Sequence, residues 1–114
     1  MNIQIRRLVV LAMLGLSLTA MADFRTTMEV HEVELVYLRL PATESGTLAI
    51  SECADCSALV LRVNPATRYV LNKQTVSLVD FRKAIAGVSN RGGVIVDVYH
   101  DLATNTATQL RVKL

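Results

Sequence analysis

The chain has 114 residues, and its 12 basic and 10 acidic side chains give a formal net charge of +2. It holds three Tyr, two Phe and no Trp. Proteins that bind nucleic acids usually present a basic stripe with stacking aromatic side chains, so this composition argues against a nucleic-acid partner. The length is that of one domain, with a core small enough for a covalent cross-link to matter.

The first 22 residues have the layout of a secretory signal peptide. Arg6 and Arg7 form a short basic region, an apolar run covers residues 8–20, and Ala20-Met21-Ala22 is a small-residue cleavage site. A membrane anchor is the alternative, but an apolar run of about 13 residues is shorter than the roughly 20 that span a bilayer. We therefore expect a periplasmic or secreted protein without a membrane span after cleavage. Without the two arginines, the mature chain is electrically neutral.

The remaining residues, 23–114, are expected to form a single β-rich domain. β-Branched and apolar residues predict strands over residues 30–40, 46–51 and 57–63. Pro41 ends the first strand, and the segment 41–46 reads as a turn. Segments 67–72 and 74–78 flank Asn72-Lys73, which is typical of a two-residue hairpin because Asn tolerates a positive φ.

One helix is predicted after this hairpin. Ser77 is its candidate N-cap, Asp80 follows three residues later, and Gly87 is its stop. The apolar face of this helix consists of Leu78, Phe81, Ala84 and Ile85.

Two final strands show the clearest alternation, over residues 93–100 and 107–114, and a polar connection joins them. The order of elements predicts a mainly β fold, namely a small antiparallel OB-like β-barrel with one helix. Such closure buries half-apolar strands without leaving open edges. The alternative is an open α+β sheet with the helix packed on one face.

Several short segments also carry a resemblance. The run TRYVLNKQTVSLVDF, followed by VIVDVYH, is similar to OB-like periplasmic domains. Together with GTLAISECADC and QLRVKL, it resembles small secreted or periplasmic β-proteins of Gram-negative bacteria. The resemblance covers most of residues 38–114. It implies an OB-like fold and an envelope location, and it transfers no catalytic residue.

Cys53 and Cys56, in the segment SECADCSAL, are the only cysteines and have three interpretations. In an exported domain the pair is expected to form a disulfide bond, which would pin the turn between two strands. A thiol–disulfide oxidoreductase would instead need the first cysteine at a helix N-terminus, and the residues that follow here are strand-like. A metal site would need further donors, and His31 and His100 would complete a set for zinc or copper.

No other constellation specifies chemistry. Tyr99, His100 and Asp101 gather polar groups at a strand end and form a candidate binding rim. Nucleophile, phosphate-loop and metalloprotease motifs are missing from the sequence. We therefore expect a small non-enzymatic periplasmic binding or accessory protein without a cofactor. Its partner would be another envelope protein or a polysaccharide. A thiol–disulfide or metal-handling protein that uses the cysteine pair is the alternative.

Overall fold

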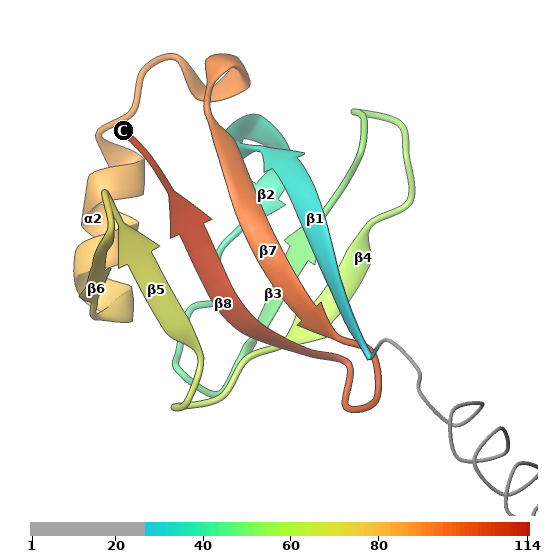
Figure 1. The fold of residues 1–114 in the computed structure, drawn as a ribbon. Helices are drawn as coiled ribbons and strands as arrows, with labels where there is room; N and C mark the ends of the chain where they lie inside the picture. The colour runs from blue at the N-terminus through green and yellow to red at the C-terminus, as the bar shows by residue number, and fades with distance from the viewer. Residues whose placement is uncertain (1–26) are drawn as a thin grey trace, which may run out of the picture.

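The computed structural model describes residues 27–114, so the predicted signal peptide and its cleavage site lie outside the described part. This part is mainly β, with eight strands in one sheet and a single α-helix (Figure 1). The strands are β1 (Met28–Glu34), β2 (Leu38–Arg39), β3 (Thr47–Ile50), β4 (Leu59–Arg62), β5 (Arg68–Leu71), β6 (Gln74–Val76), β7 (Ile95–Asp101) and β8 (Thr106–Val112). The helix is α2 (Leu78–Ala86), and two 3-10 turns are η1 (Leu35–Tyr37) and η2 (Arg91–Gly93). Within residues 27–114, no helix has the length and apolar character needed to cross a membrane.

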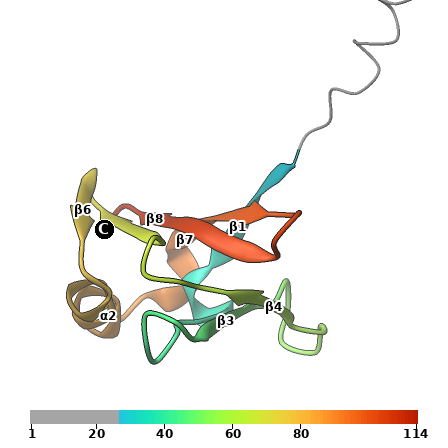
Figure 2. The ribbon, with the colours of Figure 1, turned by 90° about the horizontal axis from the view of Figure 1, so that it is seen from below.

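The sheet folds over into two layers. One layer runs β6–β5–β8–β7–β1, and the other runs β4–β3–β2 (Figure 2). A single parallel bridge, between Arg62 of β4 and Thr106 of β8, joins the two layers. Only Thr106, the first residue of β8, pairs with β4, whereas the residues from Gln109 to Val112 pair with β5.

The predicted closed antiparallel barrel is not formed. The sheet stays open because β1 and β2, the two ends of its hydrogen-bonded path, do not pair with each other. It is also mixed rather than purely antiparallel, since β8 runs parallel to both β4 and β5. The open sheet matches the predicted alternative in this respect, while the predominance of strands matches the first prediction.

The 3-10 turn η1 explains why the first predicted strand is divided. Sequence alternation predicted one strand over residues 30–40, but the chain leaves the first layer after Glu34 and re-enters a strand at Leu38. The backbone N–H of Leu35 donates to the Val94 carbonyl at 2.8 Å, which holds the turn against the start of β7. Leu35 and Leu38 are both buried, so the turn carries these two side chains from one layer to the other without exposing them, whereas Val36 between them is exposed.

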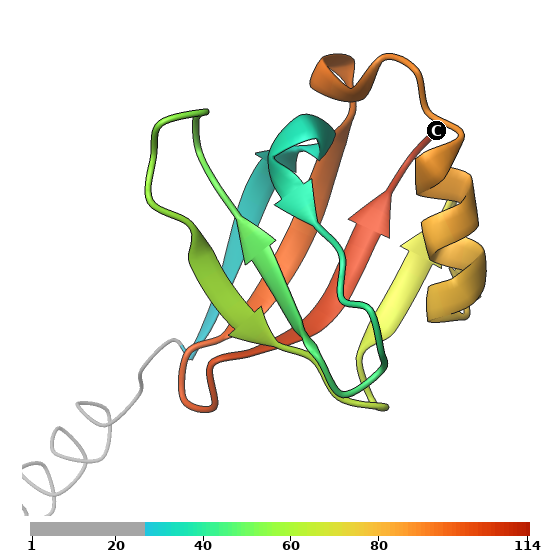
Figure 3. The same ribbon diagram turned by 180° about the vertical axis from the view of Figure 1, so that it is seen from behind.

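The core lies between the two layers, and α2 closes one end of it. Its largest fully buried side chains include Leu48 and Leu61 from the second layer and Val96, Val98 and Leu110 from the first. The helix lies beside β5 and β6, on the side of the first layer that faces β3 and β4 (Figures 2 and 3).

The local predictions for the hairpin and the helix are confirmed. Asn72 and Lys73 have φ values of 50° and 70°, as a two-residue turn between β5 and β6 requires. The Ser77 hydroxyl accepts a hydrogen bond from the Asp80 N–H at 3.1 Å, which is the predicted N-cap. Gly87 follows as the C-cap in a right-handed conformation, so it ends the helix without the positive φ typical of this position.

Candidate functional site

Cys53 and Cys56 are joined by a disulfide bond in the connection between β3 and β4. Their Cα atoms lie 5.1 Å apart, and the Cys56 N–H donates to the Cys53 carbonyl within the same turn. The two flanking strands pair in register from Thr47 with Arg62 to Ile50 with Leu59. The cross-link therefore lies where the sequence predicted it, at the tip of a β-hairpin.

The surroundings of the disulfide lack the feature that activates a thiol. The chain passes from Cys56 through Ser57 and Ala58 directly into β4, so no helix begins at either cysteine. A helix N-terminus is what lowers the pKa of the attacking thiol in C-x-x-C oxidoreductases. The geometry thus favours a covalent clamp on the turn over thiol–disulfide exchange.

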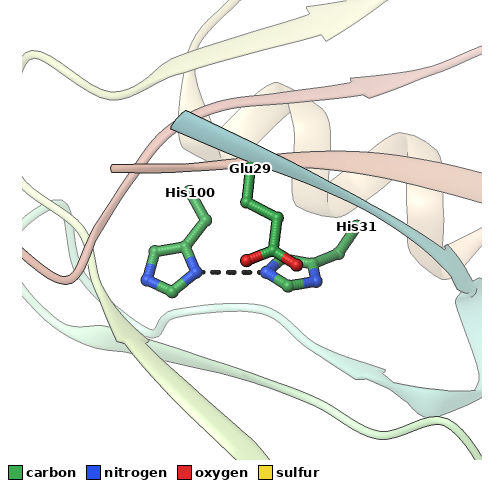
Figure 4. A group of neighbouring side chains, drawn as sticks. All are labelled: Glu29, His31 and His100. Atoms are coloured by element: carbon green, nitrogen blue, oxygen red, sulfur yellow. Dashed lines mark hydrogen bonds between the residues drawn. The ribbon is translucent and has the colours of Figure 1, made fainter. Parts of the chain in front are cut away.

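The two histidines, 69 residues apart in sequence, lie side by side (Figure 4). His31 projects from β1 and His100 from the end of β7, both toward the interior between the layers. Nε2 of His31 lies 3.1 Å from Nδ1 of His100, and the two ring centroids are 5.3 Å apart. The structure therefore brings together the histidine half of the predicted metal-donor set, and it leaves the disulfide-bonded cysteines out of the cluster.

The hydrogen bond with Asn105 favours one tautomer of neutral His100. Nδ2 of Asn105 donates to the Val60 carbonyl at 3.4 Å, which turns Oδ1 toward Nε2 of His100 at 2.9 Å. An amide oxygen only accepts, so Nε2 of neutral His100 carries the proton and Nδ1 carries a lone pair. Nε2 of His31 then donates to that lone pair.

A β-bulge and a left-handed residue hold these groups in place. Tyr99 is opposite Gln109 while His100 is opposite Ala107, so Thr108 is the extra residue in β8. Asn105, in the connection between β7 and β8, has a φ of 53°, a conformation that Asn adopts more readily than most residues.

Glu29 is the third donor of the cluster. It precedes His31 by two residues on the same face of β1 and lies directly opposite His100 in the β1–β7 register. One ligand atom from each of Glu29, His31 and His100 lies within 4.8 Å of the others. Within residues 27–114, no other group of three histidine, cysteine or carboxylate side chains gathers in this way.

The predicted rim of Tyr99, His100 and Asp101 does not share one face. Strand alternation in β7 turns His100 inward with Val98, where it is buried, and leaves Tyr99 and Asp101 partly exposed on the outer face. The sequence interpretation grouped three adjacent residues, whereas a strand separates neighbours. The alternation of the valines with Tyr99 was the signal that could have placed His100 inside.

A groove of about 630 Å³ lies between β1 and the disulfide-bonded turn. Its wall on the β1 side runs from His31 to Glu34, and Cys56 and Leu59 line the opposite side. Three carboxylates line it, Glu32, Glu34 and Glu52, and none of its lining residues is Lys or Arg. We call this feature the acidic groove. Sequence reasoning missed it, because its two walls come from segments about 20 residues apart.

No family model, no curated protein and no solved structure matches the chain. The interpretation of the site therefore rests on its geometry.

Proposed function

We propose that this chain is a small non-enzymatic binding protein of the bacterial envelope that recognises an extended, basic segment of another envelope protein. The segment would add as a strand to the free edge of β1, with alternate side chains in the acidic groove. The OB-like relationship and the envelope location belong to the same proposal. The observation that carries the proposal is the free edge of β1 beside a groove that is lined by three carboxylates and by no Lys or Arg.

The free edge of β1 offers unpaired backbone groups. Antiparallel pairing alternates between residues that bond the partner strand and residues that point away from it. Leu35 bonds Val94 on the β7 side, so the outward groups belong to the residues at even positions, Met28, Val30, Glu32 and Glu34. Among the described strands, only β7 pairs with β1.

An added strand would place its side chains on two different surfaces. Alternate side chains would point inward, toward His31, Val33 and Leu59 along the acidic groove. The others would lie on the outer face, where Met28 is 41% exposed and Val30 is 49% exposed. Strand addition draws affinity from the main chain and specificity from such alternate pockets.

Charge selects the partner. β1 carries Glu29, Glu32 and Glu34 without a Lys or Arg, so pairing β1 with a second copy of itself would bring like charges together. A segment that alternates Lys or Arg with apolar residues carries all its cations on one face of the added strand, where they would meet carboxylates of β1, and its apolar side chains on the other face. This complementarity favours a basic polypeptide over a homodimer.

Two synthetic peptides as long as β1 test the proposal by fluorescence anisotropy, one alternating Lys with Val and the other alternating Glu with Val. We expect the basic peptide to bind and to shift the NMR amide signals of residues 28–34. The Val30→Pro variant removes one outward N–H and leaves the β1–β7 ladder intact. It should bind about two- to tenfold more weakly, since a net backbone hydrogen bond contributes about 0.5–1.5 kcal/mol.

The matched control is Val30→Thr, which keeps the N–H and the strand preference. Equal affinity of the Pro and Thr variants, or equal binding of the acidic peptide, would contradict strand addition. Binding of soluble envelope glycan fragments in place of either peptide would contradict the choice of a polypeptide partner.

A further inference from the structure

We propose that Glu29, His31 and His100 form a binding site for a divalent transition-metal ion, Zn²⁺ or Cu²⁺. This site is distinct from strand addition, because Glu29 and His31 are at the positions of β1 whose backbone pairs with β7, His100 belongs to β7 itself, and metal binding requires no polypeptide partner. The donor set contains no cysteine, since both cysteines of the chain are in the disulfide.

The spacing of the two histidine nitrogens suits one shared ion. Zinc lies about 2.0–2.1 Å from a histidine nitrogen, and ligand angles between about 90° and 109° then place two nitrogens about 2.8–3.4 Å apart. The observed separation between Nε2 of His31 and Nδ1 of His100 is 3.1 Å. An ion beside the line that joins the two nitrogens can therefore bind both rings once each ring turns its lone pair toward it, and neutral His31 then carries its proton on Nδ1.

The hydrogen bonds of His100 hold its Nδ1 toward Nε2 of His31, next to the position that an ion would take. His100 is 6% exposed, and its Nε2 proton is held by Asn105, whose amide is held in turn by Val60. Metal-binding histidines characteristically donate their second ring N–H to an oxygen acceptor in this manner, which fixes tautomer and ring orientation. Asn105 is thus the positioning residue of the site.

Glu29 supplies the negative charge and a third ligand. Its carboxylate lies in front of the His31 ring in Figure 4, and one ligand atom from each of the three residues lies within 4.8 Å of the other two. Two imidazoles and one carboxylate suit zinc and copper, whereas calcium and magnesium prefer all-oxygen sets. Three protein ligands leave one position for water or a small molecule, and His31 also lines the acidic groove, through which an ion can enter.

The test uses the protein purified without a histidine tag after expression of the full-length chain and stripped with EDTA. Calorimetric titration with Zn²⁺ or Cu²⁺ near neutral pH should show one ion per chain, with Cu²⁺ bound more tightly than Zn²⁺. The chain has two histidines, His31 and His100. Zn²⁺ should therefore shift the imidazole NMR signals of both.

Three variants locate the ligands. His31→Gln should weaken binding by more than about 100-fold, because loss of a direct ligand exceeds the 10- to 100-fold effect of losing an outer hydrogen-bond partner. Glu29→Gln should also weaken binding. Glu32→Gln makes the same charge change on the opposite face of β1 and should bind as the unmodified protein does. His31 is half-buried, and circular dichroism checks that each variant is folded.

The proposal is overturned if neither ion binds, if Zn²⁺ leaves the imidazole signals in place, or if binding survives His31→Gln unchanged. Equal weakening in Glu29→Gln and Glu32→Gln would also overturn it, because it would show attraction by surface charge alone. None of these outcomes bears on peptide binding at the edge of β1.

Discussion

Two buried polar side chains, His100 and Tyr69, differ in whether their polar atoms have hydrogen-bond partners. His100 has a partner for each ring nitrogen. Tyr69 is 4% exposed and packs on Phe81 with ring centroids 5.4 Å apart, and its hydroxyl has no hydrogen-bond partner among the described residues. A buried polar group without a partner costs about 1–3 kcal/mol. The hydroxyl of Tyr69 is therefore a local source of instability.

Tyr69→Phe should keep the ring packing and remove this cost. We expect the free energy of unfolding to stay the same or to rise by up to about 1 kcal/mol, measured by urea denaturation, because deleting an unpaired buried polar group is neutral or stabilising. A loss of more than about 1 kcal/mol would show that the hydroxyl has a favourable partner.

The same variant has a pH signature. Burial, with a smaller contribution from the negative charge of Glu44, raises the pKa of Tyr69 above its ordinary value of 10.0. The neutral phenol is thus favoured in the folded state, and its contribution to stability is complete below pH 10 and is lost as the pH rises toward the folded pKa. The stability of the unmodified protein should fall in this range more steeply than that of Tyr69→Phe.

At the scale of elements, the hairpin of β3 and β4 combines a short ladder with a covalent clamp. The four-residue strands pair completely, and the disulfide crosses the connection between them. A bond that closes so small a loop removes little entropy from the unfolded chain, about 1–2 kcal/mol in the chain-entropy treatment. Its effect should be confined to the turn and to the wall of the acidic groove that the turn forms.

The double variant Cys53→Ser, Cys56→Ser tests this estimate. We expect its free energy of unfolding to be lower by about 1–2 kcal/mol, with an unchanged far-ultraviolet circular dichroism spectrum. Zinc binding should be retained, because neither sulfur belongs to the proposed ligand set. Loss of zinc binding in the folded double variant would indicate that the cysteines take part after all.

At the scale of the whole molecule, Asn105 ties the two layers together where they share only one backbone bridge. Its carbonyl accepts from the Arg62 N–H at 3.1 Å, and its side chain bonds Val60 of the second layer and His100 of the first. Asn105 therefore links the two layers, holds β4 in position and orients the ring of His100 so that Nδ1 faces His31.

Asn105→Ala and Asn105→Gly separate the backbone role from the side-chain role. Both variants lose the amide, but Gly accepts a φ of 53° and Ala does not. We expect Ala to be less stable than Gly by about 1 kcal/mol in urea denaturation. Both should bind zinc about 10- to 100-fold more weakly. Equal stability of the two variants would contradict the role assigned to the left-handed conformation.

The local part of the fold could be predicted from the sequence. The turn at Asn72-Lys73, the helix that begins after Ser77 and the alternation of β7 and β8 depend on neighbours within a few residues, so their patterns are visible along the chain. The break after Glu34 could not be predicted, because it depends on the contact of η1 with Val94, about 60 residues later in the sequence. The sequence suggested His31 and His100 as metal donors only together with Cys53 and Cys56, which the disulfide removes from the set, and without Glu29 or Asn105.

By itself, the sequence therefore determined the approximate positions of the strands after Pro41, the helix after Ser77, the hairpin turn and the position of the cross-link. Only the tertiary structure decided that β8 pairs in parallel with β4 and β5, that the sheet stays open along β1, and that His31 meets His100 rather than the cysteines. The physical reason is the separation along the chain over which each effect acts. Residue preferences and alternation act between near neighbours, whereas strand pairing across the molecule is set by how the two layers bury their apolar faces against each other.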